Sequence, residues 1–525
     1  MNVAQRDRGM VTTEHAMLVP YGRFAQQVGL IEAVERVLFG MKTYVHSPAD
    51  KVIELFVHIS AGGMHVNELA RSVHPLVRDQ AVAQAWAQES FASASGVSAL
   101  LHSVSPESVV ALKVELAKVL EPYRRRILRE VSPAWLVVDL DLTGLVVSDQ
   151  AATYEGADYG YMGEIARLGR GYQFARAQLA APRDALVLGG FLHPGHTISA
   201  HCLKELVGLV EEQLGRPRRR VEAVEARLQS GQRQLATVDS ELVKLAGRAK
   251  ASPNYQARLA RRRERLLEEI KVGQAQIAEM TADNASNPNP RRIILRLDGG
   301  FGDSEGLAWL YEQGYCFVAR AHNQKVAEGL RQEAGLNWQK VSKNGFIAES
   351  QRTTFGRCPY PLRLFCSRQE RGAGRPEHWS ALVVTPELDP TAWPARRVGT
   401  FYNQRQSIEA GIKEAKGIFA SRHLPTRHQP GIALYQELVL LAQNLLRWFR
   451  RQALGNTVFA AAGIKELVRI GANSRAEVIS RPGSTLLRFA PSGLWAGLTL
   501  SLNSQVAWQL PLPSFDDFLL AGVGP

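Results

Sequence analysis

The chain has 525 residues, more than one hydrophobic core usually organises, so we expect several structural units. Its hydrophobic content of 45% and charged content of 22% are typical of a globular protein. Four cysteines without a paired spacing exclude a disulfide framework. The net charge of +13 indicates either a nucleic-acid partner or a basic surface that only favours solubility.

The N-terminus, MNVAQRDRGM, lacks the apolar core of a signal peptide. No apolar run approaches the ~20 residues that a membrane helix needs. We therefore expect a cytoplasmic protein that has no membrane partner.

Residues 1–130 are predicted to form a helical domain. Apolar residues recur there at three- and four-residue spacing, and the segment 105–128 opens on a serine with Glu107 in its first turn. Short helices that carry Arg and His suit a module that binds DNA ends. Helices that pack without any ligand are the alternative, and this region alone favours the alternative.

After residue 130 the pattern changes to strands that alternate with helices. Apolar, β-branched segments predict strands at 134–147, 172–181, 185–193, 292–300 and 314–323. Helical periodicity predicts helices at 199–215, at 304–313, from about 403 and at 431–450. This alternation predicts an α/β fold in which helices flank a mixed sheet.

Two insertions are expected to interrupt the α/β core. Residues 212–282 carry two heptad arms joined at Ser252, which predicts an antiparallel coiled-coil hairpin with Gly231 opposite Gly273 in a thin or flexible layer. Dimerisation, DNA contact and a passive spacer remain open as its role. Its basic run, Arg261 to Arg263, is balanced by nearby glutamates and predicts a solvated face. Residues 325–400 predict short strands with basic residues between them.

The predicted order of units follows. They are a helical domain (1–130), three parts of the α/β core (131–211, 283–324 and 401–455), the coiled-coil insertion (212–282), the β-rich insertion (325–400) and a small C-terminal domain (456–525).

Acidic residues are embedded in one predicted strand and end another. Asp139 and Asp141 are two residues apart, so both project from one strand face, as metal ligands or as solvated edge acids. Asp298 ends another apolar strand and precedes two glycines, which suits either close approach of a ligand or an ordinary Asp-Gly turn.

The segment 401–417, FYNQRQSIEAGIKEAKG, carries a polar stripe. Tyr402, Arg405, Glu409 and Lys416 lie along one predicted helix face, and Lys413 follows Glu409 by one turn. A solvated face with an Arg–Glu ion pair is the alternative. Gly411 would leave room for close approach by another chain or by DNA.

Two acidic strand positions and a helical glutamate together make a ligand set for two hard divalent cations, Mg²⁺ or Mn²⁺. In two-metal phosphoryl transfer one ion activates the attacking oxygen and the other stabilises the leaving oxygen.

The segment 402–416 resembles the Y-x2-R-x3-E-x6-K (YREK) signature of the hairpin-forming insertion-sequence DDE transposases, with Tyr402, Arg405, Glu409 and Lys416 in register. The segments DLDLTGL and LRLDGGF resemble the first and second aspartate motifs of that family. The Asp-x-Thr pattern favours Asp141, with Thr143, over Asp139. Together with YEGADYGY and HLPTR, the order of motifs resembles the D-x-D-x-T branch, over roughly residues 15–450. The long coiled-coil hairpin departs from the family pattern.

This resemblance implies an RNase H-like core in which Asp141, Asp298 and Glu409, with Asp139 as a further candidate, hold two Mg²⁺ or Mn²⁺ ions. It implies that other residues contact DNA or phosphate, namely Tyr402, Arg405, Lys413, Lys416 and Thr143. Arg422 and Arg427, just after the Glu409 helix, are further expected DNA contacts.

The resemblance also implies cut-and-paste transposition. Water would cut the transposon end, the freed 3′-OH would form a hairpin on the opposite strand, and after reopening it would join target DNA. The expected partners are double-stranded DNA (terminal inverted repeats and target) and a second copy of the chain in a homodimeric synaptic complex, at the bacterial nucleoid. A nuclease or resolvase that does not transfer strands, and a catalytically silent DNA-binding protein, are the alternatives.

Overall fold

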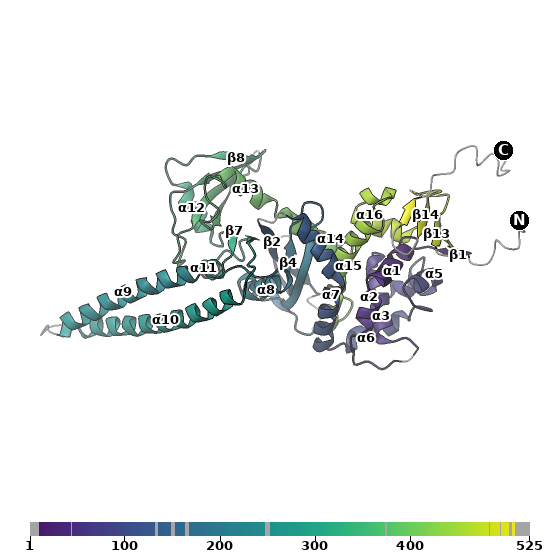
Figure 1. Ribbon diagram of the computed structural model, residues 1–525, viewed down its shortest axis with the longest axis horizontal. Helices are drawn as coiled ribbons and strands as arrows, with labels where there is room; N and C mark the ends of the chain where they lie inside the picture. Colours follow the sequence, from purple (N-terminus) through teal and green to yellow (C-terminus); the bar gives the residue numbers. More distant parts are fainter. Residues whose placement is uncertain are drawn as a thin grey trace, which may run out of the picture.

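The computed structural model describes residues 10–43, 45–131, 135–148, 153–162, 167–246, 252–372, 375–481, 484–493 and 495–502, together with the backbone of 507–509. Figure 1 shows three parts in a row: a helical part near both termini, a central part built on a sheet, and a long helical hairpin that projects away from it. No helix in the described ranges has both the length and the apolar character that crossing a membrane requires.

Within the described residues, seven α-helices precede the central sheet and form the helical part. They are α1 (Leu18–Gln27), α2 (Leu30–Glu35), α3 (Pro48–Ser60), α4 (Glu68–Arg71), α5 (Gln80–Ala85), α6 (Ala94–Ser103) and α7 (Pro106–Glu130). The predicted helix start at Ser105 is confirmed, because the Ser105 side chain accepts a hydrogen bond from the backbone N–H of Ser108 and caps α7. The helices expected in this region are therefore present.

A short strand that the sequence did not predict opens the described chain. Strand β1 (Met10–Thr13) pairs antiparallel with β12 (Ala476–Arg481), far away in the sequence. The sheet continues with β13 (Ser484–Phe489), β14 (Thr499–Leu502) and β15 (Ala507–Gln509), and α16 (Ile464–Arg469) precedes it. The two ends of the chain thus share one small sheet beside the helical part.

The central sheet has ten strands in the described residues. They are β2 (Leu136–Val146), β3 (Asp158–Met162), β4 (Arg167–Leu179), β5 (Leu186–Pro194), β6 (Ile293–Leu297), β7 (Cys316–Arg320), β8 (Gln339–Ser342), β9 (Gly345–Glu349), β10 (Arg363–Gln369) and β11 (His378–Val384). Strands β2, β6 and β7 run parallel at its centre, and β4 pairs antiparallel with both β2 and β5. The sheet is therefore mixed, as predicted.

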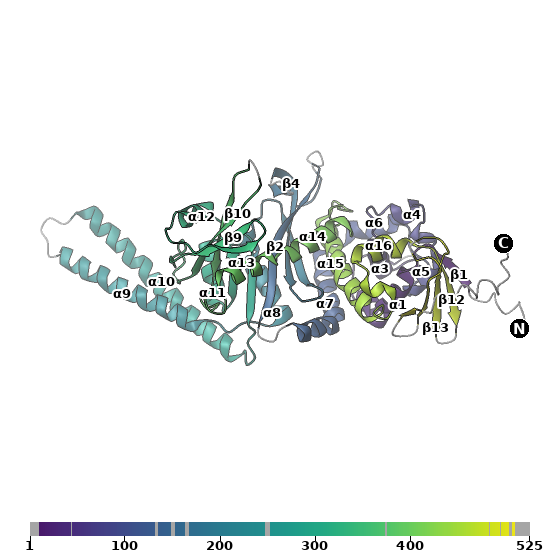
Figure 2. The same cartoon turned by 90° about the horizontal axis from the view of Figure 1, so that it is seen from above.

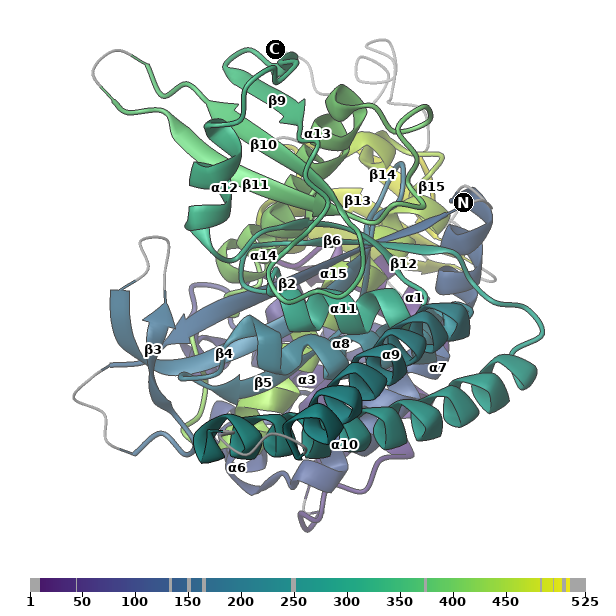
Figure 3. The same cartoon turned by 90° about the vertical axis from the view of Figure 1, so that its left-hand side faces the viewer.

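The β-rich segment predicted at 325–400 does not form a sheet of its own. Strand β11 pairs antiparallel with β7, and β10, β9 and β8 follow in order, so these four strands extend the central sheet. Figure 3 shows β9–β11 at one end of the sheet and β3–β5 at the other. The parallel strands β2, β6 and β7 consequently lie in its interior.

Helices cover the sheet and join it to the helical part. They are α8 (Ser199–Leu214), α11 (Ser304–Glu312), α12 (Gln324–Arg331), α13 (Ala395–Asn403), α14 (Gln406–Gly417) and α15 (Gln429–Gln452). Helix α15 packs on β5 and also on α1, α3, α6 and α7, between the two parts (Figure 2). Tyr21, Phe24 and Tyr123 contact Trp448 or Phe449 of α15. One continuous hydrophobic core therefore spans both parts.

The projecting hairpin consists of α9 (Val221–Ala246) and α10 (Pro253–Ala285), which pack against each other. A Cβ placed on Gly231 would come closest to Ile270, and one on Gly273 closest to Leu228. Each glycine therefore faces a branched side chain three residues from its predicted partner. The expected glycine-on-glycine layer is wrong: each glycine makes room for a larger side chain of the other helix.

Candidate active site

The two aspartate motifs lie on neighbouring parallel strands, with Asp141 within β2 and Asp298 directly after β6. The register of β2 and β6 pairs Leu140 with Leu297, so Asp141 and Asp298, the next residue of each strand, lie side by side. Parallel strands carry their carboxyl ends to one edge, where a ligand can approach. Asp141 is 8% exposed, and its Oδ1 accepts a hydrogen bond from the backbone N–H of Leu142 (2.9 Å). The Asp298 Oδ1 accepts one from Gly300 (3.0 Å).

The sequence predicted that the third motif lies on one continuous helix, but the structure divides it between two helices. Tyr402 is on α13, whereas Glu409 and Lys416 are on α14, and the chain turns at Gln404 and Arg405 between them. Tight hydrogen bonds mark this corner: the N–H of Arg405 donates to the carbonyl of Tyr402, and that of Ser407 to Gln404. The corner places Arg405 at the start of α14 and turns its side chain toward the strand ends.

Arg405 gathers the three predicted carboxylates around one guanidinium. Its Nη2 lies 3.1 Å from Oδ1 of Asp141 and 3.8 Å from Oδ2 of Asp298, and its Nη1 lies 3.1 Å from Oε1 of Glu409. The side chain of Arg405 is only 8% exposed. Residues from β2, from the end of β6 and from α14 therefore converge on one buried positive charge.

The electrostatics of this cluster follow from its burial. Burial, together with the nearby carboxylates of Asp298 and Glu409, raises the pKa of Asp141 to about 6, although Arg405 opposes the shift. Burial alone would lower the pKa of Arg405, but Asp141 and Asp298 more than reverse this and raise it. The cluster thus combines a buried carboxylate and a buried guanidinium with two carboxylates that solvent reaches, Asp298 and Glu409.

Asp139 lies on the same strand as Asp141 and has a different partner. Both of its oxygens accept hydrogen bonds from Arg296 of β6, Oδ1 from Nε (2.6 Å) and Oδ2 from Nη2 (2.8 Å), in a pair that is almost fully buried. Arg296 also donates to the carbonyl of Phe401, and Ser407 Oγ donates to Asp139. This pair therefore fastens the corner between α13 and α14 to the sheet.

The other residues of the predicted stripe are placed as follows. The Lys416 ammonium donates to the Thr143 hydroxyl (2.7 Å) and to the Gly144 carbonyl (2.9 Å), which joins the end of α14 to β2. Lys413 is exposed on α14. Tyr402 is partly buried, and burial raises its pKa to about 12, so its phenol stays protonated as a hydrogen-bond donor.

Arg422 and Arg427 lie in the loop after α14. Arg422 contacts the ring of His423, and Arg427 donates to Thr153 Oγ1 (2.8 Å). Neither makes an ion pair with the three carboxylates among the residues that the structure describes. The structure therefore does not bring these two arginines into the carboxylate cluster.

Arg176 was missed by the sequence reasoning. It lies on β4 directly opposite Asp141, is 1% exposed, and donates to Gln178 and to Gln443 of α15 (both 2.8 Å). Burial lowers its pKa to about 9. Arginines inside apolar strands, as in YQFARAQL and IILRL, were the signal that could have found Arg176 and Arg296, because buried charges need partners.

Gly411 has a different neighbour from the predicted one. It is buried, and a Cβ there would lie 2.9 Å from Arg176 Nη2 and from Gln178 Oε1. Its carbonyl accepts a hydrogen bond from Gln443 (2.8 Å). The missing side chain thus lets α14 approach β4 of the same chain, and not another chain or DNA.

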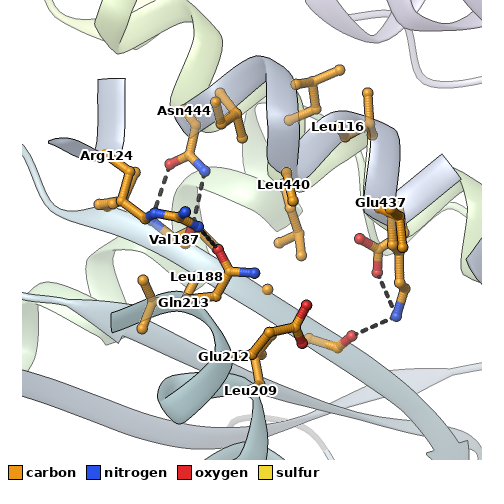
Figure 4. Close-up of a pocket in the computed structure, with 18 of the residues that line it drawn as sticks. Leu116, Arg124, Val187, Leu188, Leu209, Glu212, Gln213, Glu437, Leu440 and Asn444 are labelled. Carbon is orange, nitrogen blue, oxygen red and sulfur yellow. Dashed lines mark hydrogen bonds and ion pairs between the residues drawn. The ribbon is translucent and has the colours of Figure 1, made fainter. Parts of the chain in front are cut away.

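A cavity of about 450 Å³ lies away from this cluster (Figure 4). It is lined by apolar residues of α7, β5, α8 and α15, and Asn444 bridges the backbone of Val187 on its wall. A Lys113–Glu437 ion pair lies at one side of it. None of the predicted site residues lines this cavity.

The donor set of the cluster fits hard divalent cations, because its three carboxylates come from different elements and offer only oxygen ligands. In the described residues, however, no group of three or more His, Cys, Asp or Glu side chains is arranged to hold a metal ion. The Arg405 guanidinium lies between the carboxylates, so a metal could bind there only if Arg405 moved.

Comparison with known proteins bears directly on this cluster. Residues 263–445 match the family model of the transposase DDE domain. The match makes this part of the chain similar to the DDE domain of transposases. The part of the chain that matches the transposase domain includes Asp298, Arg405 and Glu409 and begins after Asp141. No curated protein matches the chain.

Proposed function

We propose that this protein is a cut-and-paste DNA transposase whose active site is Asp141, Asp298 and Glu409. The observation that carries the proposal is the convergence of these carboxylates, from β2, the end of β6 and α14, on Arg405. A solvated glutamate with a local ion pair would not draw in carboxylates from two strands. The match to the transposase DDE domain adds independent support.

We further propose that the core is RNase H-like. Support comes from the mixed sheet, in which the two strands that carry the aspartates run parallel at the centre, the hairpin β4–β5 lies beside them, and the glutamate helix α14 packs on β2. This arrangement lets one strand pair and one helix supply all three carboxylates.

In this proposal Asp141, Asp298 and Glu409 would hold two Mg²⁺ or Mn²⁺ ions, which when bound activate the attacking oxygen and stabilise the leaving oxygen of a phosphodiester. Asp139 positions the site through Arg296, because both of its oxygens are engaged. The raised pKa of Asp141 means that protons compete with the metal near pH 6.

The basic residues of the site would bind the DNA backbone. Arg405, released from the carboxylates, offers a planar fork that suits a phosphate, and Lys416 offers a point charge beside Thr143. Tyr402 stays protonated and can donate a hydrogen bond to a phosphate or stack on a displaced base. Lys413, Arg422 and Arg427 would contact the flanking duplex.

The remaining parts of the chain have roles that follow from this proposal. Residues 1–130 would bind the element ends, and two copies of the chain would pair in the synaptic complex. Hairpin formation at the cut end, followed by strand transfer, completes the proposed reaction.

The test combines purified protein, a plasmid that carries the flanking element ends, and Mg²⁺ or Mn²⁺. We expect metal-dependent cuts and hairpin products on a denaturing gel, and none with Glu409→Ala. Lys416→Ala and Arg405→Ala are expected to slow cleavage without abolishing it.

Two outcomes would favour the alternatives. Cuts without hairpins or joined products indicate a nuclease on the same core. DNA binding without cleavage in either metal indicates a catalytically silent DNA-binding protein.

A further inference from the structure

The outer half of the helical hairpin, residues 230–246 and 253–271, carries a charge pattern that the linear sequence conceals. Its seam is defined by the buried side chains Val238, Leu259 and Leu266, with Leu235 and Leu242 packed against them. Because successive helical residues turn by about 100°, the seam fixes which exposed residues lie on each flank.

Contacts between the two helices identify the flanks directly. On one flank Arg262 of α10 lies 3.5 Å from Gln234 of α9, and the Tyr255 hydroxyl lies 3.2 Å from Glu241. On the opposite flank Arg263 pairs with Asp239 (2.7 Å). Arg262 and Arg263 are neighbours in sequence, yet they lie on opposite sides of the hairpin.

We call the first side the basic flank. Helical spacing from Arg262 and Gln234 places four exposed cations on it: Lys244, Arg258, Arg262 and Arg265. Its acids are Glu241 and Glu269, of which Glu269 pairs loosely with Arg265 (3.6 Å). Among the described residues Lys244 has no acidic partner.

The opposite flank has no excess of basic residues. Asp239 and Glu264 lie there with Arg263 and Lys271, whereas Arg261 and Glu268, seven residues apart, both lie on the outer face of α10. The run of arginines followed by glutamates, which looks neutral along the chain, is thus sorted by the hairpin into one basic flank and one flank without net charge.

The hairpin is firmly attached at its base. Arg219 pairs with both Glu211 of α8 and Asp283 of α10 (2.7 Å each), and Arg227 pairs with Glu312 of α11 (2.7 Å). Arg227 also reaches Gln276 across the two helices. These contacts hold the hairpin as a stiff arm, so the basic flank keeps a fixed direction relative to the sheet.

We propose that the basic flank binds the phosphate backbone of duplex DNA. Guanidinium groups two helical turns apart, about 10 Å along the helix, can follow a row of phosphates, and a backbone ligand needs no pocket. Arg262 lies about 35 Å along α10 from the base, so the arm reaches duplex well outside the carboxylate site. The choice of DNA over an acidic protein rests on the proposed transposase function.

The test measures the affinity of the full-length protein for a labelled random duplex of about 60 base pairs, by fluorescence anisotropy over a range of salt concentrations. The flank variant carries Lys244→Gln, Arg258→Gln, Arg262→Gln and Arg265→Gln. The matched control variant adds Glu264→Lys on the opposite flank and Glu268→Lys on the outer face of α10, which restores the net charge. All these side chains are exposed, and circular dichroism checks that both variants keep their helices.

We expect both variants to bind about tenfold more weakly or worse, and the slope of log K against log salt to fall by up to about 3.6, since each lost phosphate contact removes about 0.9. Wild-type affinity in the flank variant, or recovery in the charge-restored control, would overturn the inference. If the wild-type protein cuts element ends while the flank variant binds normally, only the arm inference fails. If the wild-type protein binds no DNA, the proposed function fails with it.

Discussion

Burial raises the pKa of both aspartates of β2, but they should respond in opposite ways to the same substitution, because Asp139 has Arg296 as its own bidentate partner whereas Asp141 shares Arg405 with two other carboxylates. Asp139→Asn removes one partner of a buried ion pair and leaves the guanidinium of Arg296, 2% exposed, without a counter-charge. Breaking such a pair costs about 3–5 kcal/mol. We therefore expect Asp139→Asn to lower the free energy of unfolding by this amount and to loosen the corner that carries Arg405.

Asp141→Asn should stabilise the metal-free protein. The folded pKa of about 6 lies above the ordinary 3.8, so ionised Asp141 opposes folding. For a raised acid pKa, the stabilising effect is complete below pH 3.8 and is lost as pH rises through 6. A shift of about two units corresponds to roughly 3 kcal/mol, which Asn would relieve at pH 7.5, and about half as much at pH 5.

The assay is urea unfolding of wild type and both variants in EDTA at pH 7.5 and pH 5, followed by tryptophan fluorescence. A calorimetric titration with Mn²⁺ then measures metal binding by each variant. Asp139→Asn should still bind the metal under conditions in which it remains folded, whereas Asp141→Asn should not. Equal destabilisation by the two substitutions, or an unchanged midpoint in Asp139→Asn, would refute the different roles assigned to the two residues.

Three further predictions follow from buried positions. Gly411→Ala places a Cβ 2.9 Å from Arg176 Nη2, so we expect the free energy of unfolding to fall by about 1–3 kcal/mol and cleavage to slow. Gly417→Ala is the control, because open space surrounds Gly417, and it should leave stability and cleavage unchanged. Identical urea midpoints for the two variants would contradict this prediction. Burial raises the pKa of Glu54 from 4.5 to about 8, so the stability that its protonated form contributes is lost as pH rises from 4.5 through 8. Glu54→Gln should flatten that part of the curve of unfolding free energy against pH. Parallel curves for the wild type and the variant would show that Glu54 does not titrate there. Tyr402→Phe should weaken DNA binding or cleavage equally at pH 7 and pH 9, because a phenol with a pKa near 12 stays protonated at both; an effect confined to one pH would contradict the hydrogen-bond donor role.

Local patterns in the sequence were sufficient to predict most helices and strands of the central part. The segments with alternating or β-branched apolar residues form β2, β4, β5, β6 and β7. The segments with apolar residues at three- and four-residue spacing form α8, α11 and α15. The motif spacing also singled out Asp141, Asp298 and Glu409, which the structure brings together around Arg405. These features depend on neighbours a few residues apart, which the sequence displays directly.

Contacts between distant segments decided the rest. Asp139 and Asp141 share a strand face, and only the parallel register with β6 shows that Asp139 meets Arg296 while Asp141 meets Asp298 and Arg405. The pairing of β1 with β12 likewise joins opposite ends of the chain. Strand register is set by the packing of the whole sheet, so periodicity within one segment cannot supply it.

The helical hairpin shows both what local sequence patterns determine and what contacts between distant segments decide. The heptad spacing predicted two arms that fold back on each other, because each arm carries its own row of apolar seam residues. The register between the arms, and with it the neighbours of Gly231 and Gly273, came out three residues from the prediction. The sorting of arginines and glutamates onto opposite flanks also required the paired helices, since a flank exists only once a second helix has fixed the direction of the seam.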